Sequence, residues 1–104
     1  MPEYVLLYRS PAGYDNADAD VAAWNTWLAS IGTNLLDVGR PAVQSATVGA
    51  AAPELGLTGF SIIAARDMEA AKAVAGRCPA LATGGAVEVG ALVDLPNGHG
   101  PESD

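Results

Sequence analysis

Apolar and polar residues follow two periods along this chain, and these periods indicate which segments form strands and which form helices. Residues 3–9 are a run of tyrosine, valine and leucine with a charged residue at each end, which is typical of a mostly buried strand. Residues 18–38 predict one long helix, because apolar residues recur there at steps of three and four: Val21, Trp24, Trp27, Leu28, Ile31 and Leu35. Gly39 suits the left-handed position after a helix, and Pro41 prevents continuation.

The middle of the chain predicts a hairpin followed by a second helix. Residues 41–49 are β-prone, residues 49–54 indicate a turn, and residues 57–65 contain bulky apolar residues that suit the hairpin's second strand. Asp67 is the expected N-cap of a helix that runs to about residue 75 and ends at Gly76.

The C-terminal part predicts one more strand and then a tail. Residues 86–93 alternate, with Val87, Val89, Ala91 and Val93 on one side and Glu88 and Gly90 on the other. Residues 94–104 contain proline, glycine, asparagine and acids without an apolar pattern. We therefore expect one domain, residues 1–93, and an acidic flexible C-terminal tail, residues 94–104.

The predicted order of elements is strand, helix, strand, strand, helix, strand, which defines an α+β fold. The ferredoxin-like arrangement of this order has one four-stranded antiparallel sheet with both helices on the same face. The other face of such a sheet needs a cover, and an identical sheet from a second subunit would supply it. Much of the 50% hydrophobic content is alanine, which buries little surface, so a partner surface would also strengthen a thin core. We expect a homodimer.

Composition and charge exclude several classes of function. Twelve acidic residues against five scattered basic ones give a net charge of −7, which repels phosphate backbones and anionic membrane surfaces, so we expect neither nucleic-acid nor membrane partners. Cys78 is the single cysteine and His99 the single histidine, so we expect no disulfide and no metal site. Gly84-Gly85 lacks the lysine of a phosphate loop, and we expect no cofactor. Without a signal-like or membrane-spanning run, the expected location is the cytoplasm.

Four segments in one order resemble the YCII-related (DGPF-domain) family. The resemblance is carried by Thr58-Gly59-Phe60-Ser61-Ile62-Ile63, Asp67-Met68-Glu69-Ala70-Ala71, Gly76-Arg77-Cys78-Pro79-Ala80-Leu81 and Gly84-Gly85-Ala86-Val87-Glu88-Val89. The opening Tyr4-Val5-Leu6-Leu7-Tyr8 also looks like the family's first strand, so the resemblance covers roughly residues 3–93.

The resemblance implies a dimeric α+β barrel, in which two ferredoxin-like sheets pack face to face, but it implies no particular reaction. The Asp-Gly-Pro-Phe motif that names the family is missing, and Ala51-Ala52-Pro53-Glu54-Leu55-Gly56 stands in its place. Some relatives are thought to use a His–Asp pair in a dehydrochlorinase-like reaction. The single histidine here, His99, lies in the expected tail, so that chemistry has no matching residue.

Aromatic residues expected on the helix-covered face are candidates for a ligand site. Such a pocket between helix and sheet would be lined by Tyr8, Trp24, Trp27, Phe60 and Ser61. The alternative is that these residues are ordinary core. The main functional hypothesis is a small homodimer that binds a small apolar or aromatic molecule, or that serves only as an interaction module.

Glu88 and Cys78 are the candidates for chemistry. A partly desolvated Glu88 could act as a general acid or base with Tyr8 and Ser61 orienting the substrate, as in a cofactor-independent lyase, isomerase or monooxygenase. The alternative, which we favour, is an ion pair between Glu88 and an arginine, Arg9 or Arg66. Cys78 could be a reactive thiol, but a small buried apolar role suits it better.

Overall fold

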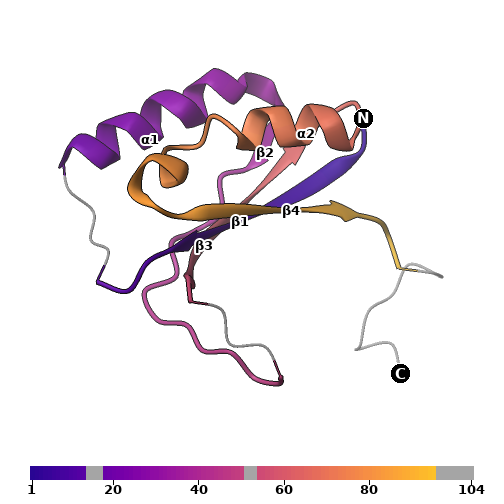
Figure 1. The fold of residues 1–104 in the computed structure, drawn as a ribbon. Helices are drawn as coiled ribbons and strands as arrows, with labels where there is room; N and C mark the ends of the chain where they lie inside the picture. The colour runs from indigo at the N-terminus through magenta and orange to yellow at the C-terminus, as the bar shows by residue number, and fades with distance from the viewer. Residues whose placement is uncertain (14–17, 51–53, 96–104) are drawn as a thin grey trace.

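The computed structural model describes residues 1–13, 18–50 and 54–95, and it shows a sheet with helices on one of its faces (Figure 1). The strands are β1 (Glu3–Ser10), β2 (Leu35–Asp37), β3 (Gly56–Ala64) and β4 (Ala86–Leu92). The helices are α1 (Asp18–Ile31) and α2 (Met68–Ala75), and two short 3-10 helices follow them, η1 (Gly32–Asn34) and η2 (Pro79–Thr83). The predicted α+β class, with a four-stranded antiparallel sheet and two helices, is confirmed.

The four strands form one antiparallel sheet in the order β2-β3-β1-β4. The two long central strands, β1 and β3, pair along their whole length apart from an irregularity between Tyr8 and Arg9. This arrangement is compatible with a ferredoxin-like fold. No helix in the described ranges is both long and apolar enough to cross a membrane.

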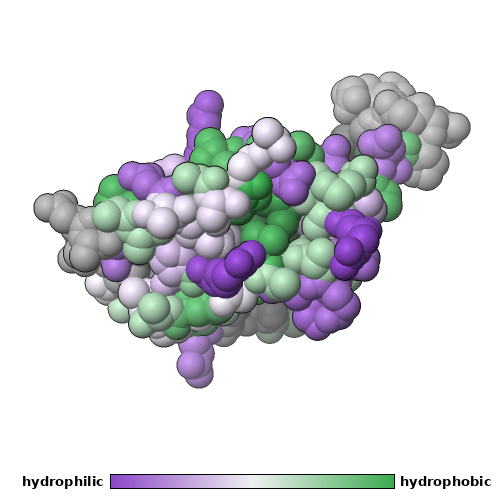
Figure 2. All heavy atoms as spheres, turned by 90° about the horizontal axis from the view of Figure 1, so that it is seen from above, coloured by the Kyte–Doolittle hydropathy of each residue, from purple (hydrophilic) through white to green (hydrophobic). Residues whose placement is uncertain are grey.

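The core lies between the sheet and the helices. Alternate residues of β1 are buried on this face, namely Tyr4, Leu6, Tyr8 and Ser10, as the period of two along a strand requires. Leu6 and Ile63 are completely buried on the central strands, where they pair with Ser61 and Tyr4 respectively. The remaining buried apolar residues are mostly small: Trp27, Ala65, Ala71, Ala75, Cys78 and Ala80. Seen from the helix side, hydrophobic residues form a band between hydrophilic ones (Figure 2).

Helix α1 is shorter than the periodicity predicted, and the extension to residue 38 is wrong. The helix ends at Ile31 because Gly32 adopts a left-handed conformation, with φ of +67°, which interrupts the helical path. The chain then makes one 3-10 turn and enters β2. Leu35 still packs against the core, but it does so from a strand. The four-residue spacing between Ile31 and Leu35 therefore matches the period of a helix only by coincidence.

The strand predicted at residues 41–49 is also wrong, because β2 forms earlier in the chain. Only the start of this segment accompanies β3, through a single bridge between Pro41 and Gly59 and a backbone hydrogen bond from Ala42 to Thr58. Val43 and Val48 are each 98% exposed. Valine favours strands, but within the described residues no neighbouring strand pairs with these two positions.

Helix α2 begins and ends where the sequence predicts. The Asp67 carboxylate accepts a hydrogen bond from the Ala70 amide at 2.8 Å, which caps the helix, and that backbone hydrogen bond is the main reason that the pKa of Asp67 is lowered. The helix ends at Gly76, whose amide donates to the carbonyls of Lys72 and Val74.

The second face of the sheet carries no helix in the described residues (Figure 1). Its apolar centre consists of the β1 and β3 residues that alternate with the core positions: Val5, Leu7, Phe60 and Ile62. We call this surface the open face. Strand β4 ends at Leu92 and places Glu88 opposite Leu7, while Val87 and Val89 face the helices opposite Tyr8 and Leu6, as the alternation predicts.

Parts of the expected tail and of two loops lie outside the described residues. This applies to residues 96–104, which include His99, to residues 14–17 and to residues 51–53. Asp94 and Leu95, the first residues of the expected tail, are exposed.

Candidate ligand-binding cleft

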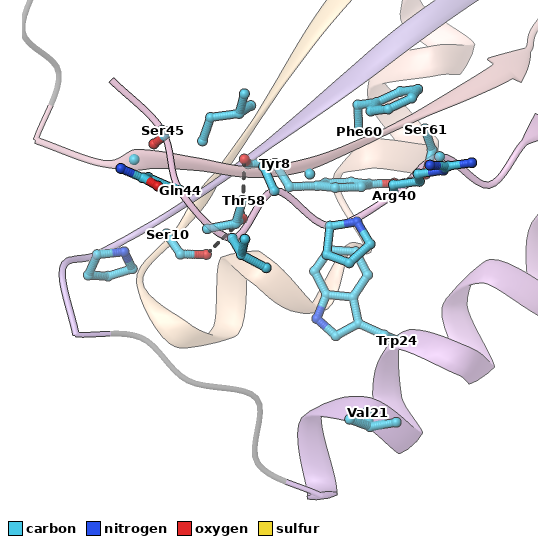
Figure 3. A pocket seen from close by; sticks show the side chains of 18 of the residues that line it. Tyr8, Ser10, Val21, Trp24, Arg40, Gln44, Ser45, Thr58, Phe60 and Ser61 are labelled. Carbon is cyan, nitrogen blue, oxygen red and sulfur yellow. Dashed lines mark hydrogen bonds between the residues drawn. The ribbon is translucent and has the colours of Figure 1, made fainter. Parts of the chain in front are cut away.

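A cleft of about 860 Å³ opens between the first half of α1, the adjoining ends of β1 and β3, and the chain segment that follows β2. Four of the five predicted ligand-binding residues line it: Tyr8, Trp24, Phe60 and Ser61. Figure 3 shows Trp24 projecting from α1 toward the sheet, with Val21 further along the same helix. The sequence pattern therefore selected residues that the fold does bring together.

Residues 38–42, which we call the strap, form the wall of the cleft opposite α1 and are held against β3. The Val38 carbonyl accepts a hydrogen bond from Ser61 Oγ at 2.7 Å, and the Ala42 amide donates to the Thr58 carbonyl at 3.0 Å. Gly39 has a φ of +74°, and a Cβ there would lie 1.6 Å from the Phe60 carbonyl oxygen. Only glycine permits this close approach, which explains why Gly39 has the predicted left-handed conformation in the strap instead of at a helix end.

Tyr8 and Ser61 form a buried polar chain at the inner wall. Tyr8 Oη donates to Ser61 Oγ at 2.7 Å, and Ser61 in turn donates to the strap at Val38. Burial raises the pKa of Tyr8 to about 12, so its phenol is protonated at neutral pH. The hydroxyl oxygen keeps acceptor capacity, and it is therefore able to accept a hydrogen bond from a ligand.

A second polar pair lies at the irregularity of β1. Ser10 Oγ and Thr58 Oγ1 are 3.3 Å apart, and Thr58 also donates to the Tyr8 carbonyl at 3.3 Å (Figure 3). All three residues line the cleft. These contacts fix the shape of the sheet where β1 and β3 lose their regular register.

The two tryptophans have different environments. The rings of Tyr8, Trp24 and Trp27 pack edge to face, with centroids 4.7 Å apart for Tyr8 and Trp24 and 5.6 Å apart for the two tryptophans. These distances leave no space for a ligand between the rings. Trp27 is buried, donates from Nε1 to the Val74 carbonyl at 3.2 Å and does not line the cleft, so it belongs to the core.

Phe60 lines the cleft from the other face of β3. It neighbours Ser61 on β3, so its side chain points to the open face, and Figure 3 shows it on the other side of the strand from Trp24. The cleft therefore extends around the β3 edge next to the strap, and its aromatic contact on the helix side comes from Tyr8 and Trp24.

Glu88 is not part of the cleft. Its Oε1 lies 3.2 Å from Arg9 Nη2, which is the ion pair that the sequence offered as an alternative to catalysis. The carboxylate is on the open face, opposite to the face of Tyr8 and Ser61, so the structure does not bring together the three residues of the enzyme hypothesis. With side-chain exposures of 27% and 62%, the pair contributes at most about 1 kcal/mol.

Cys78 is a buried free thiol. Burial raises the pKa of the Cys78 thiol to about 11, which keeps it in its unreactive protonated form. Residues 1–13, 18–50 and 54–95 contain no group of three histidine, cysteine or acidic side chains placed to hold a metal ion.

The sequence patterns missed the strap and its charged residue, Arg40, which also lines the cleft. Gly39-Arg40-Pro41 was interpreted as the end of a helix, whereas the same residues follow a strand. The signal that could have revealed them is the pair of glycines, Gly39 and Gly59, at which two backbone segments come close together. Comparisons with family models, with curated proteins and with solved structures found no match.

Proposed function

We propose that this protein is a cytoplasmic homodimer that binds a small apolar or aromatic molecule in the cleft between α1, β3 and the strap. The observation that supports binding most directly is the cleft itself, which has mainly apolar walls and a few placed polar groups, as small-molecule sites do. The geometry favours binding over catalysis by Glu88, because that carboxylate lies across the sheet from Tyr8 and Ser61.

The two tryptophans provide a direct test of binding. Each indole N–H gives its own signal in a ¹H–¹⁵N NMR spectrum, and the chain has two tryptophans, Trp24 at the cleft and Trp27 in the core. Titration with a neutral aromatic molecule, 3-phenylpropanol, should shift the Trp24 signal much more than the Trp27 signal. Trp24→Phe identifies which signal belongs to the cleft. Equal shifts, or no shift up to the solubility limit, would count against a binding site here.

The homodimer is supported by the open face. Val5, Leu7, Phe60 and Ile62 form an apolar centre there without a covering helix, and an identical face related by a two-fold axis would cover it. This arrangement would be the dimeric α+β barrel that the resemblance to the YCII-related family implies, and membership of that family is part of the same proposal.

Oligomeric state tests this second element separately. We expect sedimentation at micromolar concentration to give twice the 10.5 kDa chain mass. Leu7→Lys on the open face should give a folded monomer, whereas Met68→Lys on exposed α2 should leave the dimer intact. A wild-type monomer would disprove the dimer and leave the cleft proposal standing.

A further inference from the structure

Arg40 gives the cleft a positively charged group. It lines the cavity together with Ser61 and Phe60, and Figure 3 shows it at the wall formed by these residues. Of the described residues that line the cleft, only Arg40 and Glu54 carry a formal charge. The three ion pairs among the described residues use Arg9, Arg66 and Lys72, so none of them involves Arg40.

The backbone of Arg40 is fixed on both sides. Before it, the Gly39 amide donates to Asp37 Oδ1 at 2.8 Å. After it, Pro41 forms the bridge to Gly59 on β3, and a Cβ on Gly59 would lie 3.0 Å from the Arg40 carbonyl oxygen. The guanidinium therefore extends from a rigid support, which lowers the entropic cost of using it to hold a ligand.

Because the whole chain is acidic, the positive charge of Arg40 indicates which kind of ligand the cleft binds. A protein with a net charge of −7 repels anions in general, so an anionic ligand needs a specific positive group. A guanidinium offers two parallel N–H donors to a carboxylate, and the apolar and aromatic surfaces of Trp24 and Pro41 lie along the same cavity.

We infer that the ligand of this cleft has an apolar or aromatic body and a carboxylate that Arg40 binds. The inference rests on the proposed binding function and narrows it to a class of ligand. The body lies against Trp24 and Pro41, and the carboxylate lies at the strap. Tyr8 Oη, which uses its own proton toward Ser61, is left to accept a hydrogen bond from a polar group on the ligand body.

A matched pair of probes tests the charge separately from the shape. 3-Phenylpropionate and 3-phenylpropionamide are nearly equal in size, but only the first is an anion at pH 7. In low salt we expect the wild-type cleft to bind the anion about five- to tenfold more tightly, as followed by the Trp24 indole signal. Because the contact is exposed, raising the salt to 0.5 M should reduce this preference and leave binding of the amide unchanged.

Variants at Arg40 and Glu54 show which of the two charged residues causes the preference for the anionic probe. Arg40→Gln should abolish it, Arg40→Lys should retain part of it, and Glu54→Gln should preserve or increase it. An unchanged Trp27 indole signal verifies that each variant is folded. Equal binding of both probes by the wild type, or a preference that survives in Arg40→Gln, would overturn the carboxylate inference alone. Failure of the two probes and of 3-phenylpropanol to bind would overturn the proposed function itself.

Discussion

The two ends of the helix-covered face differ in how completely they are filled. At one end, Leu6 and Ile63 are fully enclosed, and the alanines of α2 let the helix lie close to the sheet. At the other end, Tyr8 and Trp24 border an open cleft, and the wall opposite α1 is the strap, the segment that follows β2. The same strands thus provide a packed core and a binding cavity, and the difference arises from what covers them.

The largest expected effect contrasts one aliphatic residue at each end. Leu6→Ala should destabilise the protein by about 2–5 kcal/mol, because it leaves a cavity in a closed core. Val21→Ala, at a half-exposed position on the cleft, should cost less than about 1 kcal/mol. Urea unfolding followed by circular dichroism measures both. Similar losses would show that the cleft end is as tightly packed as the core end.

The two tryptophans sharpen the contrast further. Trp27→Phe should cost about 1–3 kcal/mol, since it replaces a buried indole with a smaller ring and removes the hydrogen bond from Nε1 to the Val74 carbonyl. Trp24→Phe should cost less than Trp27→Phe in thermal unfolding and should change ligand binding more. The reverse order in either measurement would contradict the division between core and cleft.

High pH tests burial at both ends. Burial raises the pKa of Cys78 from 9.0 to about 11 and that of Tyr8 from 10.0 to about 12 in the folded protein. Because both pKa values are higher in the folded protein, the folded state holds these two protons more tightly than the unfolded state does. The resulting stabilisation is complete below about pH 9 and is lost as the pH rises through 11 and 12. Urea midpoints should fall between pH 9 and 11, and less steeply in Cys78→Ala. Repeating the series in 0.5 M NaCl controls for charge repulsion; identical slopes in both proteins would contradict the burial of this thiol.

The smallest effect is expected on the opposite side of the sheet. Glu88→Gln removes an exposed ion pair with Arg9 and should change stability by less than about 1 kcal/mol. It should leave the binding of 3-phenylpropanol unchanged, because Glu88 does not line the cleft. A large loss of binding would return Glu88 to the list of functional residues.

Local signals predicted the elements that local interactions specify. The alternation in β4 placed Val87 and Val89 on the side opposite Glu88, and Asp67 marked the start of α2. The prediction was wrong between residues 32 and 49, where spacing alone could not distinguish a helix that ends at Gly32 from one that continues to Leu35. The candidate ligand residues were chosen as aromatics expected on the helix-covered face, yet this criterion also selected Trp27, which belongs to the core, and Phe60, whose side chain points to the open face.

The sequence by itself determined the class of fold, the two ends of α2 and the two sides of β4, because side-chain period and helix capping act between near neighbours. Tertiary structure decided where the cavity lies and which residues share it. Arg40 and Ser61 lie far apart in the chain, and they line the same cleft because Gly39 and Gly59 let the strap contact β3 closely. Such a contact depends on backbone segments that pair across the sheet, and no local pattern encodes it.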